Sequence, residues 1–90
     1  MNTVILTTTK NYFDEKEKVK QLEYILTSRS TAIGTVYDIT CRRAGTKISK
    51  TYDGFTDKYD RAVMIFKLLA ANLVAPEHII DVIDDMYEEI

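Results

Sequence analysis

Ala32-Ile33-Gly34-Thr35-Val36-Tyr37-Asp38-Ile39-Thr40-Cys41-Arg42 is the stretch of this 90-residue chain that decides its fold. Its side chains alternate in the period of two that is typical of a strand with one buried face. The face predicted to be buried holds Ile33, Thr35, Tyr37, Ile39 and Cys41, and the other holds Val36, Asp38, Thr40 and Arg42. Gly45 then suits a short hairpin turn, because glycine adopts the left-handed conformation that such turns need. Residues 46–52 return as a second strand, in which Lys50 interrupts the apolar face formed by Ile48 and Tyr52 and indicates a sheet edge.

Further strands are predicted on the N-terminal side of this hairpin. Residues 3–9 are short and β-branched, which favours a strand. Residues 11–20 are charged and are interpreted as a loop or a helical turn. Residues 19–28 fit either a strand or one face of a helix. We favour the strand, because Tyr24, Ile25 and Thr27 are good sheet formers.

A first helix is predicted after the hairpin. Residues 53–56 are expected to end the sheet, with Thr56 as the N-cap of a helix that continues to about residue 74. Asp57 and Asp60 suit the positive end of this helix. The helix is apolar on several sides, so we expect it to lie between the sheet and the last helix.

A second helix is predicted over residues 76–89. Pro76 suits its first position, because proline has no N–H group to leave unpaired there. Strands followed by helices indicate an α+β fold. We therefore predict a single domain over residues 1–90, with a small antiparallel β-sheet of 3–4 strands followed by two C-terminal α-helices packed on one face.

The composition places the chain among small globular proteins. It is 46% hydrophobic and 29% charged, and no apolar run reaches the roughly 20 residues of a membrane span. Residues 1–7 lack a basic region and a long apolar core, so we expect no secretory signal. Cys41 is the single cysteine and cannot form an internal disulfide. We therefore expect a cytoplasmic protein without a membrane segment or a cofactor.

Charge is divided between the two halves of the sequence. Residues 1–50 contain nine Lys and Arg against five Asp and Glu, whereas residues 51–90 contain three against nine. The formal net charge of −2 therefore combines a basic half of +4 with an acidic half of −6. Such a field influences which partners approach and how they orient, and it does not determine the fold.

An acidic stripe lies on the last predicted helix, opposite its apolar face. It consists of Asp81, Asp84, Asp85 and Glu88. A solvated face that keeps the protein soluble is the simpler interpretation. The hypothesis with a function is a docking face for an unknown protein with a basic surface. The chain would then be a non-catalytic adaptor, regulator or inhibitor. By analogy of size and charge, one form is a phage-encoded inhibitor of a nucleic-acid-handling defence enzyme.

The basic hairpin at residues 42–50 indicates an alternative function, nucleic-acid binding. It contains Arg42, Arg43, Lys47 and Lys50, and a two-stranded ribbon can enter the major groove of DNA. Four basic residues are ordinary, however, and no aromatic residue stands at the tip of the hairpin. The acidic character of the whole chain also opposes attraction to DNA.

The sequence contains no motif of a known catalytic site, so an enzyme is not predicted. His78 with Asp81 and Asp85 is a conceivable metal site, but a solvated residue at a helix start is more common, and no metal is predicted. Cys41 near Arg42 and Arg43 is a conceivable reactive thiol, although its position on the apolar face of the strand favours the core. The apolar helix and the edge strand leave a homodimer open.

The last helix also carries a family resemblance. The run Ala75-Pro76-Glu77-His78-Ile79-Ile80-Asp81-Val82-Ile83-Asp84-Asp85-Met86 resembles the C-terminal signature of a family of short uncharacterised bacterial proteins. In that family a Ser-Pro-x-His-Leu start precedes an Asp-Val-x-Glu-Asp run. Ala32-Ile33-Gly34-Thr35-Val36 is similar to the family's Tyr-Gly-Ile strand, with Ile33 in place of the Tyr and, in the helix, Ala75 in place of the Ser. The resemblance spans about residues 20–90 and implies the same order of elements, without any chemistry.

Overall fold

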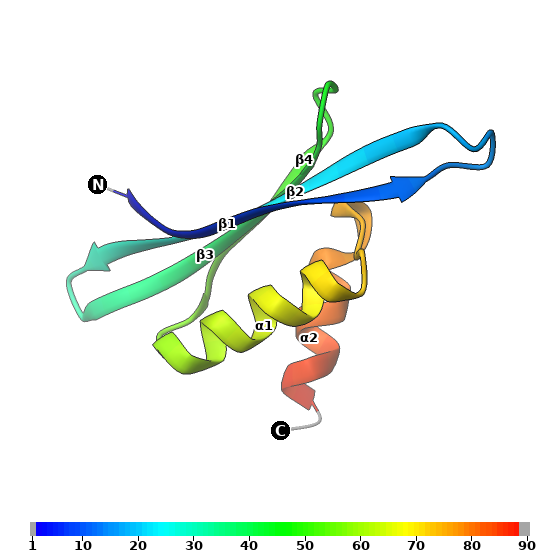
Figure 1. Ribbon diagram of the computed structural model, residues 1–90. Helices are drawn as coiled ribbons and strands as arrows, with labels where there is room; N and C mark the ends of the chain where they lie inside the picture. The colour runs from blue at the N-terminus through cyan, green and yellow to red at the C-terminus, as the bar shows by residue number, and fades with distance from the viewer. Residues whose placement is uncertain (1, 89–90) are drawn as a thin grey trace.

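The computed structural model describes residues 2–88. Four antiparallel strands form one sheet in the order β1-β2-β3-β4, and two helices follow (Figure 1). The predicted α+β fold class is confirmed, with four strands in the sheet. The elements are β1 (Asn2–Phe13), β2 (Val19–Thr31), β3 (Gly34–Arg43), β4 (Ser49–Thr56), α1 (Tyr59–Ala71), the 3₁₀ turn η1 (Pro76–His78) and α2 (Ile79–Glu88).

The predicted buried face of β3 is confirmed at Ile39 and Cys41, whereas Thr35 on that face is exposed and Asp38 on the other face is buried. Ile39 and Cys41 are fully buried, and they pair with Leu26 and Tyr24 of β2, which are buried as well. Residues 19–31 are a strand, so the helical alternative for this segment is excluded. The prediction was wrong at Ile33, whose side chain is 95% exposed. Thr31 pairs with Gly34, so residues 32 and 33 form the turn between β2 and β3 instead of the start of β3.

The β1–β2 hairpin is longer than predicted. Residues 11–20, interpreted as a loop or a helical turn, belong mostly to strands, because β1 continues to Phe13 and β2 begins at Val19. Only residues 14–18 form the connection. The Asp14 carboxylate accepts hydrogen bonds from the backbone N–H groups of Lys16 and Lys18, both at 2.9 Å. An aspartate that bonds its own backbone in this way closes a turn and competes with a helix.

β4 continues through residues 53–56, which were predicted to end the sheet. Its pairing with β3 shifts there, so three residues of β4 stand opposite the single residue Asp38. Gly54 lies in this bulge with a φ of 60°, a conformation that favours glycine. The Gly54 N–H donates to the Asp38 carboxylate at 2.6 Å. Arg29 Nε on β2 donates to both oxygens of that carboxylate, at 3.0 and 3.2 Å. The buried carboxylate thus keeps an irregular segment in the sheet.

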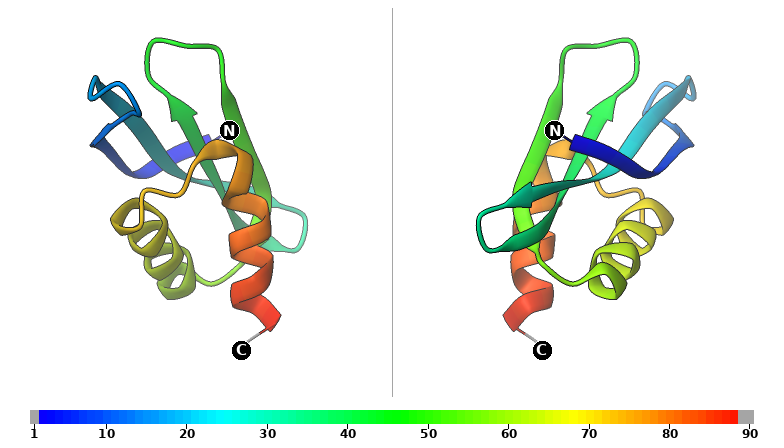
Figure 2. Two further views of the ribbon diagram at one scale, coloured as in Figure 1. Left: turned by 90° about the vertical axis from the view of Figure 1, so that its right-hand side faces the viewer. Right: turned by 90° about the vertical axis from the view of Figure 1, so that its left-hand side faces the viewer.

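Both helices lie on one face of the sheet, and neither separates the other from it (Figure 2). α1 contacts β2, β3 and β4, whereas α2 contacts β4 and η1 contacts β3 and β4. The expectation that the first helix lies between the sheet and the last helix was therefore wrong. As a result, part of the broad apolar surface of α1 meets solvent, where Met64 is 46% and Leu68 is 41% exposed.

The end of α1 explains this arrangement. Leu73 has a φ of 51°, and the N–H groups of Leu73 and Val74 donate to the carbonyls of Ala70 and Leu69. These bonds form a Schellman motif with leucine where glycine is usual. The Val74 carbonyl then accepts a hydrogen bond from the buried Tyr24 hydroxyl at 2.7 Å. The chain is thereby returned to the sheet, and the following helix begins on β3 and β4.

The starts of the two helices differ in detail from the predictions. Thr56 is not the N-cap of α1, because it still belongs to β4, where it pairs with Tyr37. Lys58 precedes the helix and has no side-chain cap, and Asp60 lies in the first turn as predicted. Pro76 begins the C-terminal helical segment as predicted, although its first turn is 3₁₀.

The core lies between the sheet and the two helices. It is formed by Leu22, Tyr24, Leu26, Ile39, Cys41, Phe55, Ala62, Ile65, Phe66, Leu69, Ala70, Ile79 and Ile83. The other face of the sheet has no helix over it in the described part of the chain (Figure 2). Within residues 2–88, neither helix has the length and apolar character that crossing a membrane requires.

Candidate functional site

The strand topology places the two differently charged halves of the sequence toward opposite ends of the molecule. In a meander of antiparallel strands, the first and third turns lie at one end of the sheet. The basic 42–50 hairpin therefore lies there, beside the β1–β2 turn, whose residues 14–20 contain three lysines and three acidic residues. The chain leaves β4 at the opposite end, where the N-terminus of α1 and the C-terminal end of α2 lie (Figure 1). The protein is thus basic at one end and acidic at the other.

The acidic stripe lies on the exposed side of α2. Asp81, Asp84 and Asp85 are exposed, whereas Ile79 and Ile83 on the opposite side of the helix are fully buried. The side chain of Glu88, the fourth predicted member, lies outside the described part of the chain. No Lys or Arg within residues 2–88 forms an ion pair with the three described carboxylates. Their charge is therefore open to a partner.

Contacts with β4 fix the orientation of α2. The Tyr52 hydroxyl donates to Asp84 Oδ1 at 2.6 Å, and this bond raises the pKa of Tyr52. The Tyr87 hydroxyl contacts the Phe55 carbonyl, and the Arg61 guanidinium lies 5.5 Å from the centre of the Tyr87 ring. These contacts join α2 to β4 and α1. They also bring the acidic segment of residues 53–60 to the same end as Asp84.

The basic hairpin does not form one continuous patch. Arg42 and Arg43 are neighbours in a strand, so their side chains lie on opposite faces of the sheet. Arg42 pairs with Glu23 at 2.5 Å on one face, and Arg43 pairs with Glu77 at 2.8 Å on the other. Lys47 and Lys50 are exposed and have no ion-pair partner within residues 2–88. Two of the four predicted residues are therefore already neutralised.

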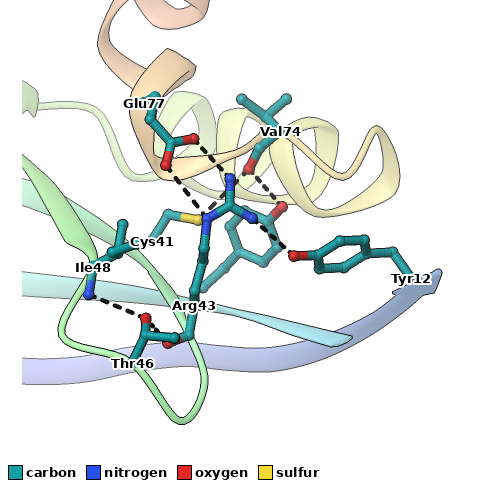
Figure 3. Close-up of polar contacts among 8 residues, drawn as sticks. Tyr12, Cys41, Arg43, Thr46, Ile48, Val74 and Glu77 are labelled. Carbon is teal, nitrogen blue, oxygen red and sulfur yellow. Dashed lines mark hydrogen bonds and ion pairs between the residues drawn. The ribbon is translucent and has the colours of Figure 1, made fainter. Parts of the chain in front are cut away.

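Arg43 joins three distant segments of the chain (Figure 3). Its Nε and Nη2 donate to the two oxygens of Glu77, at 3.3 and 2.8 Å, and its Nη1 donates to the Tyr12 hydroxyl at 2.8 Å. The bonds from Arg43 hold the pKa of the Glu77 carboxyl below its usual value. Sequence reasoning missed Tyr12 and Glu77, because each is more than thirty residues from Arg43 and no local pattern connects them.

An open groove lies beside Arg43 at the basic end. It has a volume of about 580 Å³, and Tyr12, Lys20 and Arg43 are among the residues that line it. A neighbouring hollow is lined by Phe13, which is 73% exposed, by further lysines, and also by two acidic residues, Asp14 and Glu15. The structure thus places aromatic and basic side chains together, although the tip of the 42–50 hairpin itself has no aromatic residue.

Cys41 belongs to the core, as its position in the strand predicted. Its side chain is fully buried, and its Sγ donates to the Val74 carbonyl at 3.5 Å (Figure 3). Burial raises the pKa of the thiol to about 11. At neutral pH the group is protonated and enclosed, so it lacks the thiolate character that a reactive cysteine needs.

A family model covers residues 3–89, which is nearly the whole chain. The chain belongs to DUF6514, a family of unknown function. No curated protein and no solved structure matches it. The resemblance to a family without an assigned activity is confirmed at this level. The signature at residues 75–86 and the bacterial origin stay predictions for this member of DUF6514.

His78, named above as a conceivable ligand, is exposed in this DUF6514 domain. No group of three or more His, Cys, Asp or Glu side chains within residues 2–88 has the arrangement of a metal site. His78 is the last residue of η1, beside Glu77 and in the turn before Asp81. The acidic face of α2 and the groove at the basic end are therefore the two candidate sites of this protein that follow from the predicted residues.

Proposed function

We propose that this DUF6514 protein is a non-catalytic binding protein that receives a basic surface of another protein on the acidic face of α2. The observation that carries the proposal is the difference between the two charged regions. Asp81 and Asp85 are exposed without an ion-pair partner within residues 2–88, whereas in the basic hairpin both arginines have a carboxylate partner and two lysines stay unpaired. Unpaired charges on a fixed element are the ones that attract an oppositely charged partner.

The rigidity of α2 supports a role in recognition. Ile79 and Ile83 anchor the helix in the core, and Tyr52 holds Asp84 at 2.6 Å. A partner then meets carboxylates in fixed positions. Binding therefore orders less of this protein, and costs less conformational entropy, than binding to a mobile tail would. Closely spaced carboxylates on one helix face also resemble the backbone of a nucleic acid. An inhibitor of a nucleic-acid-handling enzyme in the cytoplasm, encoded by a phage or its host, is one form of the proposal.

The test compares two pairs of substitutions that change the net charge equally. Asp81→Asn/Asp85→Asn removes two charges from α2, and Glu15→Gln/Glu17→Gln removes two from the exposed turn at the other end. Bait proteins capture partners from the lysate of the organism that encodes the chain, after nuclease treatment. The affinity for each captured protein is then measured at two salt concentrations.

We expect the α2 variant to bind about fivefold more weakly at low salt, since each exposed charge contributes up to about 1 kcal/mol. The difference should shrink at high salt because the charges are screened. The Glu15/Glu17 variant should bind like the wild type. Equal affinities for the wild type and the α2 variant would contradict the proposal.

Nucleic-acid binding at the basic end is the second candidate. It is favoured by the groove and the neighbouring hollow, where Tyr12 and Phe13 lie near Lys16, Lys18 and Lys20. Bases stack on aromatic rings beside a basic surface. Its test is binding of a labelled single strand and duplex at low salt. The variant Lys16→Glu/Lys20→Glu should abolish binding. The control is Lys58→Glu/Lys67→Glu, in which Lys58 precedes α1 and Lys67 lies in it.

A further inference from the structure

The two edges of the sheet differ in how they are protected. β4 is eight residues long, carries Lys50 and Asp53, contains a bulge and has α2 and η1 against it. β1 is twelve residues long and carries Lys10 as its one charged residue. Proteins usually protect sheet edges with short strands, charges and bulges, because an open edge pairs with other strands. β4 has these protections, and β1 has few of them.

The outer edge of β1 presents unpaired backbone groups. The strand order makes β1 an edge strand, and no other strand within residues 2–88 pairs with its outer side. Alternate residues of an antiparallel edge strand direct their N–H and C=O groups away from the sheet. An extended strand is the partner that satisfies a row of such groups. Beyond the bulge at Ile5, the pairing of β1 with β2 is regular from Leu6 to Phe13, so the edge is continuous there.

The middle of β1 is suited to pairing with itself. Thr7, Thr8 and Thr9 place a similar, uncharged side chain on both faces of the strand. Threonines opposite one another in adjacent strands can bond through their hydroxyls. This sheet already contains such a pair, since the hydroxyls of Thr40 and Thr51 lie 2.8 Å apart across β3 and β4.

The position of Lys10 favours an antiparallel second copy. Lys10 is the one charged residue of β1. A two-fold axis at Thr7–Thr9 places each Lys10 opposite a neutral residue of the partner strand. A parallel arrangement in register would bring the two Lys10 side chains together, and like charges opposite one another destabilise a strand pair.

We propose that β1 pairs antiparallel with β1 of a second copy, about a two-fold axis in the Thr7–Thr9 segment. The two four-stranded sheets become one continuous sheet, with the helices of both copies on the same face. This surface is distinct from the acidic face of α2, and the inference does not rest on the proposed function.

The first test is the mass of the protein in solution as a function of concentration. Light scattering should give twice the chain mass at high concentration. Thr7→Lys places like charges near the axis and should raise the dissociation constant about fivefold or more. Thr35→Lys, at another exposed strand threonine, should change it less than twofold. A monomer at every concentration overturns the proposal.

The second test locates the interface. Cysteines introduced separately as Thr7→Cys, Thr8→Cys and Thr9→Cys should form an intermolecular disulfide in at least one variant under mild oxidation. Ile33→Cys is the control, because that side chain is 95% exposed but lies far from the axis. Native Cys41 is buried and should not interfere. Cross-linking through Ile33→Cys as fast as through β1 would mean random collision and would overturn the β1 interface.

Discussion

Replacing Asp38 by alanine should lower the free energy of unfolding strongly, although the side chain is small. Its carboxylate is 3% exposed on the sheet face that has no helix over it. It accepts a hydrogen bond from Gly54 N–H in the β4 bulge and two contacts from Arg29 Nε. Asp38→Ala removes the acceptor for both groups at once. Asp38→Asn removes the charge and keeps an oxygen that can accept the Gly54 bond.

The expected magnitude follows from the exposure of the partners. Breaking a buried ion pair costs about 3–5 kcal/mol when the remaining charge stays buried. The Arg29 side chain is 35% exposed, so water can solvate it and the cost moves to the lower end. The Gly54 N–H, left without an acceptor, adds to the loss in the free energy of unfolding. We expect Asp38→Ala to lower the free energy of unfolding by about 3 kcal/mol and Asp38→Asn by about 1.5 kcal/mol.

The assay is urea denaturation followed by far-ultraviolet circular dichroism, because the chain has no tryptophan to report by fluorescence. Asp53→Ala, an exposed carboxylate in the same bulge, serves as the control and should lose less than about 0.5 kcal/mol. Arg29→Ala and the double variant complete a cycle that isolates the pair. If Asp38→Ala were no less stable than Asp53→Ala, the carboxylate would not be holding the bulge in the sheet, and the argument would fail.

Three further predictions concern the core and the end of α1. Tyr24→Phe leaves the Val74 carbonyl without its 2.7 Å hydrogen bond and should lower the unfolding free energy by about 1–2 kcal/mol in urea denaturation. Leu73→Gly relieves a backbone φ of 51°, so it should raise the free energy of unfolding by about 0.5 kcal/mol and move the urea midpoint to a higher concentration. Burial keeps the Cys41 thiol protonated in the folded state up to a pKa of about 11, whereas an unfolded thiol ionises near 9. Stability should therefore fall by about 1 kcal/mol between pH 8 and pH 10, and Cys41→Ala should remove that part of the fall.

The elements that local patterns predicted are those whose burial repeats along the sequence. β3 was recognised because Ile39 and Cys41 alternate with polar residues, and the buried side of α2 because Ile79 and Ile83 follow the period of a helix. Lys50 on the apolar face of β4 correctly indicated an edge strand. In each case the signal and its structural cause lie within a few residues of one another.

The elements that were predicted wrongly depend on distant partners. Gly54 looks like a chain break, and it stays in β4 because Asp38, sixteen residues away, accepts its N–H. The direct contact of α2 with β4 depends on the Tyr24–Val74 bond, across fifty residues. Residues 11–20 looked irregular because they are charged. They belong mostly to strands, because the pairing of β1 with β2 satisfies their backbone groups whatever the outward side chains are. The Asp38–Gly54 and Tyr24–Val74 partners cannot be read from a local window of sequence, whereas the β1–β2 pairing is local and its charged side chains hid it.

The two proposed surfaces lie on opposite edges of the sheet, and this separates their tests. Pairing through β1 leaves α2 free, because α2 lies against β4 at the other edge. A dimer would therefore present two acidic faces on the same side of one sheet and would bind a partner with repeated basic sites more tightly through multivalency. Thr7→Lys should then lose that avidity and keep the affinity of a single site. Asp81→Asn/Asp85→Asn should lose the single-site affinity and keep the dimer, so each surface can fail without the other.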